Sequence, residues 1–196
     1  MQIEYEATFI NIDKQIIRQK LSVLGAELIR PEFLQRRVVF NLPEGHGIPG
    51  GWLRVRDEGG KITMSLKVVD GTTIYDQKEV LLNIDNFDNA VIFLESIGSK
   101  KKAFQESRRE IWKLGDVEIM IDEWPFLEPY VEIEGVSEDA VKLVSEQMGF
   151  DYSTAVFDSV DGQYSTKYGI SKEIINQHTP EILFDMENPF LNRKDS

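Results

Sequence analysis

The 196-residue sequence contains no cysteine and only two histidines. Without cysteine, disulfide bonds and thiolate metal sites are excluded. The two histidines, His46 and His178, are far apart in the sequence, which argues against a zinc-type site. No stretch approaches the roughly 20 apolar residues that a membrane-spanning helix needs. The first residues, MQIEYEATF, also carry glutamates where a signal peptide has a basic region and an apolar run. We therefore expect a cytoplasmic protein with no membrane partner.

Positive charge is scarce as well, because 34 Asp and Glu outweigh 22 Lys and Arg and give a net charge of −12. Nucleic-acid binding usually depends on a basic face, so the charge balance argues against a nucleic-acid partner. It does not exclude an anionic small ligand, since the local field in a site depends on the charges nearest to it. The length suits one domain with an appendage, and the apolar content of 41% is that of a soluble globular protein.

The pattern of apolar residues predicts about eight strands with helices set to one side. Helical spacing is found in three segments, each with a glycine at or near its end: residues 11–27, 85–100 and 137–150. Further strands are expected from residues 34, 73 and 104, and a hairpin is expected from residues 52–56 and 61–69 around a DEGG turn. After residue 151 the pattern loosens into short helices and an extended tail. The predicted fold class is α+β, dominated by an antiparallel sheet or barrel with helices outside.

Like charges recur at every second position in several predicted strands. Glu4 and Glu6 share one face of the first strand, roughly 7 Å apart, because side chains alternate along a strand. The stretch YVEIEG repeats this arrangement with Glu132 and Glu134, and LRVR contains two arginines with the same parity. For any single row, a solvated strand face is the simpler interpretation.

Together, the rows permit a second interpretation, in which the polar faces line the interior of a barrel. Such an interior is stable only where opposite charges and a ligand compensate one another. Arginines on the walls suit a polyanion such as a triphosphate. Four carboxylates suit a hard divalent cation, Mg²⁺ or Mn²⁺.

The segments EYEATF, WLRVRDEGGKITMSLK, ESRREIW and IDEWPFLEPYVEIEG, in this order and spacing, resemble the CYTH family. This family includes class IV adenylate cyclases and thiamine triphosphatases, and its members are also called triphosphate tunnel metalloenzymes. The resemblance covers roughly residues 1 to 160. It implies an eight-stranded antiparallel β-barrel whose open tunnel binds triphosphates with a divalent metal.

The resemblance also implies roles for particular residues. It implies that Mg²⁺ or Mn²⁺ is bound by a catalytic set of carboxylates, with Asp122 as a weaker metal ligand; the set comprises Glu4, Glu6, Glu132 and Glu134. It implies triphosphate binding by five basic residues, of which Lys61 is the weaker assignment: Arg54, Arg56, Lys67, Arg109 and Lys61. Thr8 occupies the position of a family lysine. Its hydroxyl can bind phosphate but brings no positive charge, so affinity would fall unless a cation such as Arg37 compensates.

The expected function is divalent-metal-dependent hydrolysis of the terminal phosphate of a nucleoside or organic triphosphate. The candidate substrates are ATP, thiamine triphosphate and inorganic triphosphate. Class IV-type cyclisation of ATP to cyclic AMP and pyrophosphate stays open, because the same scaffold serves both reactions. A non-catalytic polyphosphate- or nucleotide-binding module is a third hypothesis, favoured by Thr8. The expected organisation is a tunnel domain over residues 1–170 and a C-terminal helix and tail over 171–196, in a monomer or homodimer.

Overall fold

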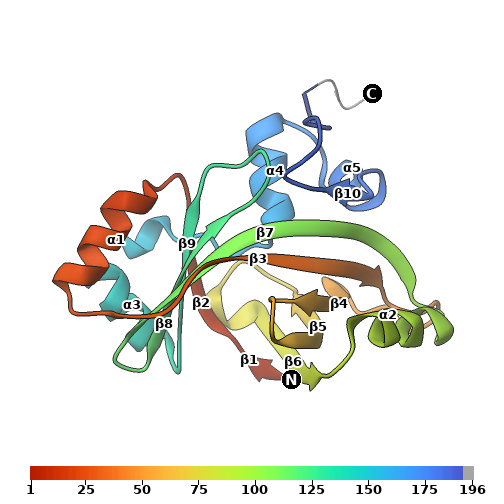
Figure 1. Ribbon diagram of the computed structural model, residues 1–196, viewed down its shortest axis with the longest axis horizontal. Coiled ribbons are helices and arrows are strands. Elements are labelled where there is room, and N and C mark those ends of the chain that lie inside the picture. Colours follow the sequence, from red (N-terminus) through yellow and green to blue (C-terminus); the bar gives the residue numbers. More distant parts are fainter. Residues whose placement is uncertain (192–196) are drawn as a thin grey trace.

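A computed structural model describes residues 1–191 and shows a strongly curved antiparallel sheet with helices on its outside (Figure 1). Along the sheet the strands follow the order β1-β6-β5-β4-β3-β7-β8-β9-β2. Their bounds are β1 Gln2–Ile3, β2 Tyr5–Phe9, β3 Glu27–Asn41, β4 Gly51–Asp57, β5 Ile62–Val69, β6 Gln77–Ile84, β7 Lys100–Leu114, β8 Val117–Glu123 and β9 Tyr130–Gly135. A short strand, β10 (Glu181–Ile182), pairs with β7 in parallel.

The sheet nearly closes into a barrel, because its two edge strands are consecutive pieces of the same N-terminal stretch. β1 pairs with β6 and β2 pairs with β9, and only Glu4 lies between β1 and β2. At this seam the Glu4 amide donates to the Gln77 carbonyl over 3.0 Å, and Gln77 Nε2 donates to the Glu6 carbonyl over 2.8 Å. The predicted α+β barrel is thus confirmed. The path holds nine strands among the described residues, since the expected first strand is split at Glu4.

Three helices cover the outside of the barrel: α1 (Lys14–Val23), α2 (Phe87–Ser96) and α3 (Glu138–Gln147). Each begins after a side chain that accepts hydrogen bonds from backbone amides of the first turn, namely Asp13, Asn86 and Ser137. These caps explain why the helices start where they do. All three helices are shorter than the predicted segments, and α2 is capped by Asn86 rather than by a later residue.

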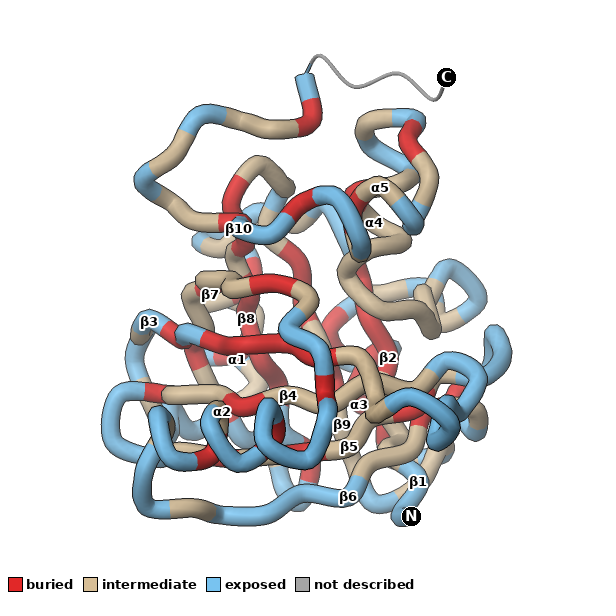
Figure 2. The backbone as a smooth tube through the Cα atoms, turned by 90° about the vertical axis from the view of Figure 1, so that its right-hand side faces the viewer, coloured by how far each residue is buried: buried red, intermediate tan, exposed pale blue. Residues whose placement is uncertain are grey.

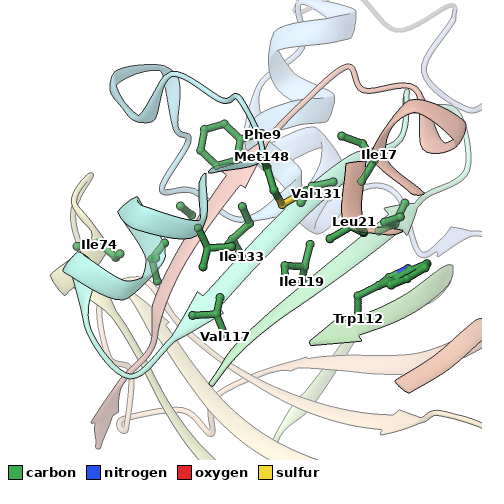
Figure 3. Close-up of a cluster of buried hydrophobic side chains, with 14 residues drawn as sticks. Phe9, Ile17, Leu21, Ile74, Trp112, Val117, Ile119, Val131, Ile133 and Met148 are labelled. Carbon is green, nitrogen blue, oxygen red and sulfur yellow. The ribbon is translucent and has the colours of Figure 1, made fainter. Parts of the chain in front are cut away.

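The main hydrophobic core lies between α1, α3 and the outer face of β2, β8 and β9 (Figure 3). Phe9 and Ile133 point into it from the strands, and Leu21 and Met148 meet them from the helical side. Figure 2 shows buried positions along the strands of the barrel wall. Because side chains alternate, burial of these apolar residues outside the barrel turns the intervening polar residues toward its interior.

Several strand starts differ from prediction. β3 starts at Glu27 rather than 34 and β7 at Lys100 rather than 104, and the two pair along almost their whole length with register shifts near Arg30. These irregularities and Pro31 break the alternation on which the prediction depended. The strand expected from residue 73 starts at Gln77, because the side chain of Asp76 accepts hydrogen bonds from Thr73 and holds a 3₁₀ turn, η1 (Ile74–Asp76).

The C-terminal part contains the short helices expected there: η2 (Tyr152–Thr154), α4 (Val160–Tyr168) and α5 (Lys172–Gln177). α4 and α5 form a second hydrophobic cluster with the strand ends, which includes Trp124, Tyr164 and Phe190. The boundary at residue 170 stays a prediction, and residues 192–196 of the expected tail lie outside the described residues. Within residues 1–191, no helix combines the length and apolar character needed to cross a membrane.

Candidate functional site

The β2–β9 register places the predicted carboxylates on one inner wall of the barrel. Glu6 lies opposite Glu134, and Thr8 lies opposite Glu132. On the next strand, Glu118 lies opposite Glu134. Cross-strand neighbours share a face, so the two ExE motifs, separated by more than a hundred residues in sequence, form one acidic surface.

A basic surface is built in the same way on the other wall. Arg37 of β3 lies opposite Arg56 of β4, and Arg54 of β4 lies opposite Ser65 of β5. Lys67 lies opposite Glu79 of β6. Arg54 and Arg56 therefore share one face of β4, as their spacing of two residues in the sequence predicts.

Both walls face a single cavity with a volume of about 930 Å³. Most of the predicted site residues line it: Glu4, Glu6, Arg54, Arg56, Lys61, Lys67, Arg109, Glu132 and Glu134. Arg37 lines it too, whereas Thr8 and Asp122 are buried and belong to the surrounding wall. Thr8 pairs through its backbone with Val156, which covers the edge of β2.

One ion pair joins the acidic and basic walls near the seam, and a second lies within the basic wall. Lys67 Nζ lies 2.9 Å from Glu4 Oε2, and Arg54 Nη2 lies 3.0 Å from Glu79 Oε1. Burial alone would raise the pKa of Glu79, but Lys67 and Arg54 outweigh it and lower that pKa to about 2. Burial raises the pKa of Glu4 to about 7 against the attraction of Lys67. Glu79 was not predicted, although it shares a face with Lys67.

Arg109 is held in place by two carboxylates. Its Nε donates to Asp122 Oδ1 over 2.8 Å, and its Nη2 lies 2.5 Å from both Asp122 Oδ2 and Glu132 Oε2. Burial would lower the pKa of Arg109, but the attraction of Asp122 and Glu132 raises it well above its usual range. Both oxygens of Asp122 are used in this contact, which orients the guanidinium. A role for Asp122 as a metal ligand stays a prediction.

The remaining carboxylates repel one another. Burial raises the pKa of Glu6 well above its usual range, and the nearby charges of Glu132, Glu134 and Glu4 raise it further. Oxygen donors crowded in this way suit a hard divalent cation, whose charge would relieve the repulsion. Among residues 1–191, no three Asp, Glu, His or Cys side chains already meet closely enough to hold a metal ion. The oxygen donors thus have the chemistry that a divalent cation prefers, but the described carboxylates lie too far apart to hold one as they stand.

The basic wall has more hydrogen-bond donors than acceptors. The pKa of Arg37 is lowered to about 9 by burial and by the charges of Arg56, Arg54 and Arg109. The Nε atoms of Arg37, Arg54 and Arg56 are buried and have no acceptor among the described residues. Glu58 pairs with Arg56 over 2.7 Å and was not predicted, because it falls in the expected turn. Buried donors without acceptors are unusual in proteins, and an anionic ligand would supply acceptors to this wall.

Comparison with known proteins gives a family match and a set of similar folds. The CYTH domain model matches residues 3–159. The PH1012 protein of Pyrococcus horikoshii is 20% identical over 80% of this chain and 96% of its own, with a TM-score of 0.66. A Vibrio parahaemolyticus protein named "putative adenylate cyclase" is 15% identical over 84% and 98%, with a TM-score of 0.71. HpAC1 of Hippeastrum, described as having a dominant triphosphatase activity, is 13% identical over 86% and 97%, with a TM-score of 0.55. Comparison with curated proteins gave no match.

Proposed function

The chain belongs to the CYTH domain family, and from this membership we propose that it is a divalent-metal-dependent enzyme that hydrolyses the terminal phosphate of a nucleoside or organic triphosphate inside the barrel. The proposal depends most on one observation: a cluster of buried arginines with unused donors faces a cluster of mutually repelling carboxylates across one cavity. A polyanion and a divalent cation, bound together, would compensate both clusters.

The metal would be Mg²⁺ or Mn²⁺, held by the carboxylates of the acidic wall, Glu4, Glu6, Glu132 and Glu134. When bound, such an ion polarises phosphoryl oxygens and makes a bound water more acidic. Arg54 and Arg56 would hold the phosphate oxygens from the opposite wall through forked hydrogen bonds. Asp122 would keep Arg109 oriented toward the same phosphates, and Lys67 would contribute a further positive charge.

Cyclisation of ATP to cyclic AMP and pyrophosphate is the second candidate. It is favoured by the likeness to proteins named as putative adenylate cyclases. The same cationic wall would serve, but the α-phosphate rather than the terminal one would be attacked. Thr8, which replaces the family lysine beside Glu132, favours a third candidate, a module that binds polyphosphate or nucleotide without turnover. A cytoplasmic location and a monomeric or homodimeric state stay predictions.

The test incubates the protein with ATP, thiamine triphosphate or inorganic triphosphate and either Mg²⁺ or Mn²⁺, and measures phosphate, pyrophosphate and cyclic AMP separately. We expect phosphate release that stops when the metal is chelated. Formation of pyrophosphate and cyclic AMP would show that the reaction is cyclisation and not hydrolysis. Triphosphate binding with no product would leave only the binding module.

Two substitutions test the separate roles of the acidic and basic walls. Glu132→Gln should reduce turnover by about 100-fold or more, because it removes a charged oxygen from the acidic wall. Arg54→Ala should mainly raise KM by about 10-fold, since it removes a charge-assisted contact to substrate. Glu95→Gln, on the exposed face of α2, is the matched control and should change neither. Equal activity in all three variants would rule out a reaction in this cavity.

A further inference from the structure

Part of the cavity wall lies outside the family domain. The family match ends at residue 159, yet α4 and α5 contribute several side chains that line the same cavity as the predicted carboxylates and arginines. They are Asp161, Gln163, Tyr164, Lys172, Ile175 and Asn176. We call this surface the C-terminal wall. In Figure 1, α4, α5 and β10 lie together on one side of the barrel, next to β7.

The C-terminal wall is anchored to the barrel. β10 pairs with β7, with Ile182 opposite Gln105, and the Tyr164 hydroxyl donates to the Pro125 carbonyl over 2.7 Å. Tyr164 and Ile175 are buried and pack in one hydrophobic cluster with Trp124. The wall is therefore a preformed part of the cavity, as ligand sites usually are.

The chemistry of this end differs from that of the arginine wall. Asp158 and Asp161 are balanced by Lys172, which lies 2.6 Å from Asp158, and by Lys102 of β7, so these four cavity-lining residues carry no net charge. Trp124, Tyr164 and Ile175 form an apolar backing to this end of the cavity, although they are almost fully buried. Such a surface gives phosphate no electrostatic advantage, but it suits a flat, uncharged organic ring.

The polar groups of the wall favour a ligand that donates hydrogen bonds. Asn176 Nδ2 donates to Asp161 Oδ2 over 2.6 Å, and the Ser159 hydroxyl donates to the other oxygen. Each carboxylate oxygen can accept a second hydrogen bond, so Asp161, which lines the cavity, retains acceptor capacity, although Lys172 Nζ also lies 3.8 Å from its Oδ1. Arg37 connects the two ends, because its guanidinium lies 4.3 Å from the Trp124 ring and belongs to the arginine cluster.

We propose that the C-terminal wall binds the organic end of the substrate, and that the protein prefers a triphosphate bearing a flat ring with N–H donors to inorganic triphosphate. This inference rests on the proposed function, since the phosphates must occupy the arginine wall. The size of the cavity agrees, because about 930 Å³ lies within the range of roughly 300–1,000 Å³ found for sites that enclose organic ligands.

Equilibrium binding tests the preference without turnover. Non-hydrolysable imido analogues of ATP and of inorganic triphosphate are titrated with Mg²⁺ into the full-length protein by calorimetry. We expect the ATP analogue to bind about 10-fold more tightly or better, in line with the discrimination a complementary pocket provides. The imido analogue of purine riboside triphosphate, whose ring lacks the amino group and has no N–H donor, should bind more weakly than the ATP analogue. Equal affinities for the imido analogues of ATP and of inorganic triphosphate would overturn the inference.

Substitutions locate the effect. Asn176→Phe should fill the part of the cavity beside the C-terminal wall. It should weaken binding of the ATP analogue by about 10-fold and change binding of the inorganic triphosphate analogue by less than about twofold. Gln177→Phe, on the neighbouring exposed position of α5, is the matched control. If Asn176→Phe misfolds by circular dichroism, Gln163→Ala with Thr166→Ala as control gives the same comparison on α4. Equal loss of both ligands would contradict a ring-binding role.

The two proposals fail separately. Product formation decides the proposed function, whereas the ratio of the two affinities decides the role of the C-terminal wall. Hydrolysis of both triphosphates with equal affinities would keep the first and overturn the second. Tighter binding of the ATP analogue with no product from either triphosphate would overturn the proposed hydrolysis and keep the role of the C-terminal wall.

Discussion

At the scale of single residues, Glu6 is expected to lower the stability of the folded protein while it contributes to the proposed activity. Its carboxylate is half-buried beside Glu132 and Glu134, and burial followed by these charges raises its pKa well above the usual range. An acid whose pKa is raised on folding destabilises the folded protein at pH values above its unfolded pKa. Glu6→Gln keeps the shape and removes the charge.

We therefore expect Glu6→Gln to unfold at a temperature a few degrees higher than the wild type at pH 7 in the presence of a chelator, since about 1 kcal/mol corresponds to roughly 2–4 °C at this size. The same variant should lose metal-dependent turnover. Calorimetry and the product assay measure the two effects, with Glu95→Gln as control. A lower unfolding temperature would contradict the repulsion, and unchanged activity would make the acidic wall a plain structural surface.

The residues that could be predicted are those whose position depends only on strand parity. Parity placed Glu4, Glu6, Glu132 and Glu134 correctly, because alternation is a local property of the chain. Glu79 was not predicted as a site residue, because its position opposite Lys67 depends on the β5–β6 register. That register is set by the turn at η1, which the sequence pattern presented as part of a strand. The contact between Asp122 and Arg109 depends in the same way on the β7–β8 register.

At the scale of elements, one ion pair fastens α1 to the long strand β7. Arg18 of α1 donates through Nε to both oxygens of Glu110, at 3.1 and 3.0 Å, and through Nη2 at 2.7 Å. Trp112 Nε1 donates to the same carboxylate over 2.6 Å. Burial would raise the pKa of Glu110, but Arg18 and Trp112 outweigh it and lower that pKa. No sequence pattern predicts this contact, since 92 positions separate Arg18 from Glu110.

The sign of this shift gives a pH-dependent prediction. A carboxyl with a lowered folded pKa stabilises the protein above its unfolded pKa, near 4.5, and the contribution is lost as the pH falls through the folded pKa. Glu110→Gln should cost about 1–3 kcal/mol at pH 7, because Arg18 and Trp112 lose a charged acceptor. The difference from wild type should shrink between pH 5 and pH 3. Urea unfolding at pH 7, 5 and 3.5 measures it, and a constant difference would contradict the role of the ion pair.

At the scale of the whole molecule, the site exists only once the barrel closes. The acidic wall joins the first strand to β9, and the seam at Glu4 brings β6 against the N-terminal stretch. The C-terminal wall then returns along β7 and covers part of the cavity. Family resemblance predicted the barrel, because its motifs are strand motifs. It could not predict the C-terminal wall, which lies beyond the matched residues and whose sequence shows no strong periodicity.

Closure also couples ligand binding to the stability of the whole fold. The protein carries a net charge of −12, yet its cavity concentrates arginines whose charges repel one another without a ligand. A triphosphate with Mg²⁺ at about 100 times its Kd should stabilise the folded state by about 2.7 kcal/mol, which corresponds to a rise in Tm of roughly 5–10 °C. Calorimetric scans with and without inorganic triphosphate measure this rise.

Sulfate at matched ionic strength is the control, because it screens charge without bridging the two walls. Arg54→Ala should reduce the rise in Tm at a fixed triphosphate concentration, since weaker binding contributes less to folding. A rise of the same size with sulfate, or one that Arg54→Ala leaves unchanged, would mean that the anion acts outside the cavity. A rise in Tm that requires both Mg²⁺ and triphosphate would show that the two ligands bind together. In that case Mg²⁺ alone does not stabilise the acidic wall, and triphosphate alone does not stabilise the basic wall.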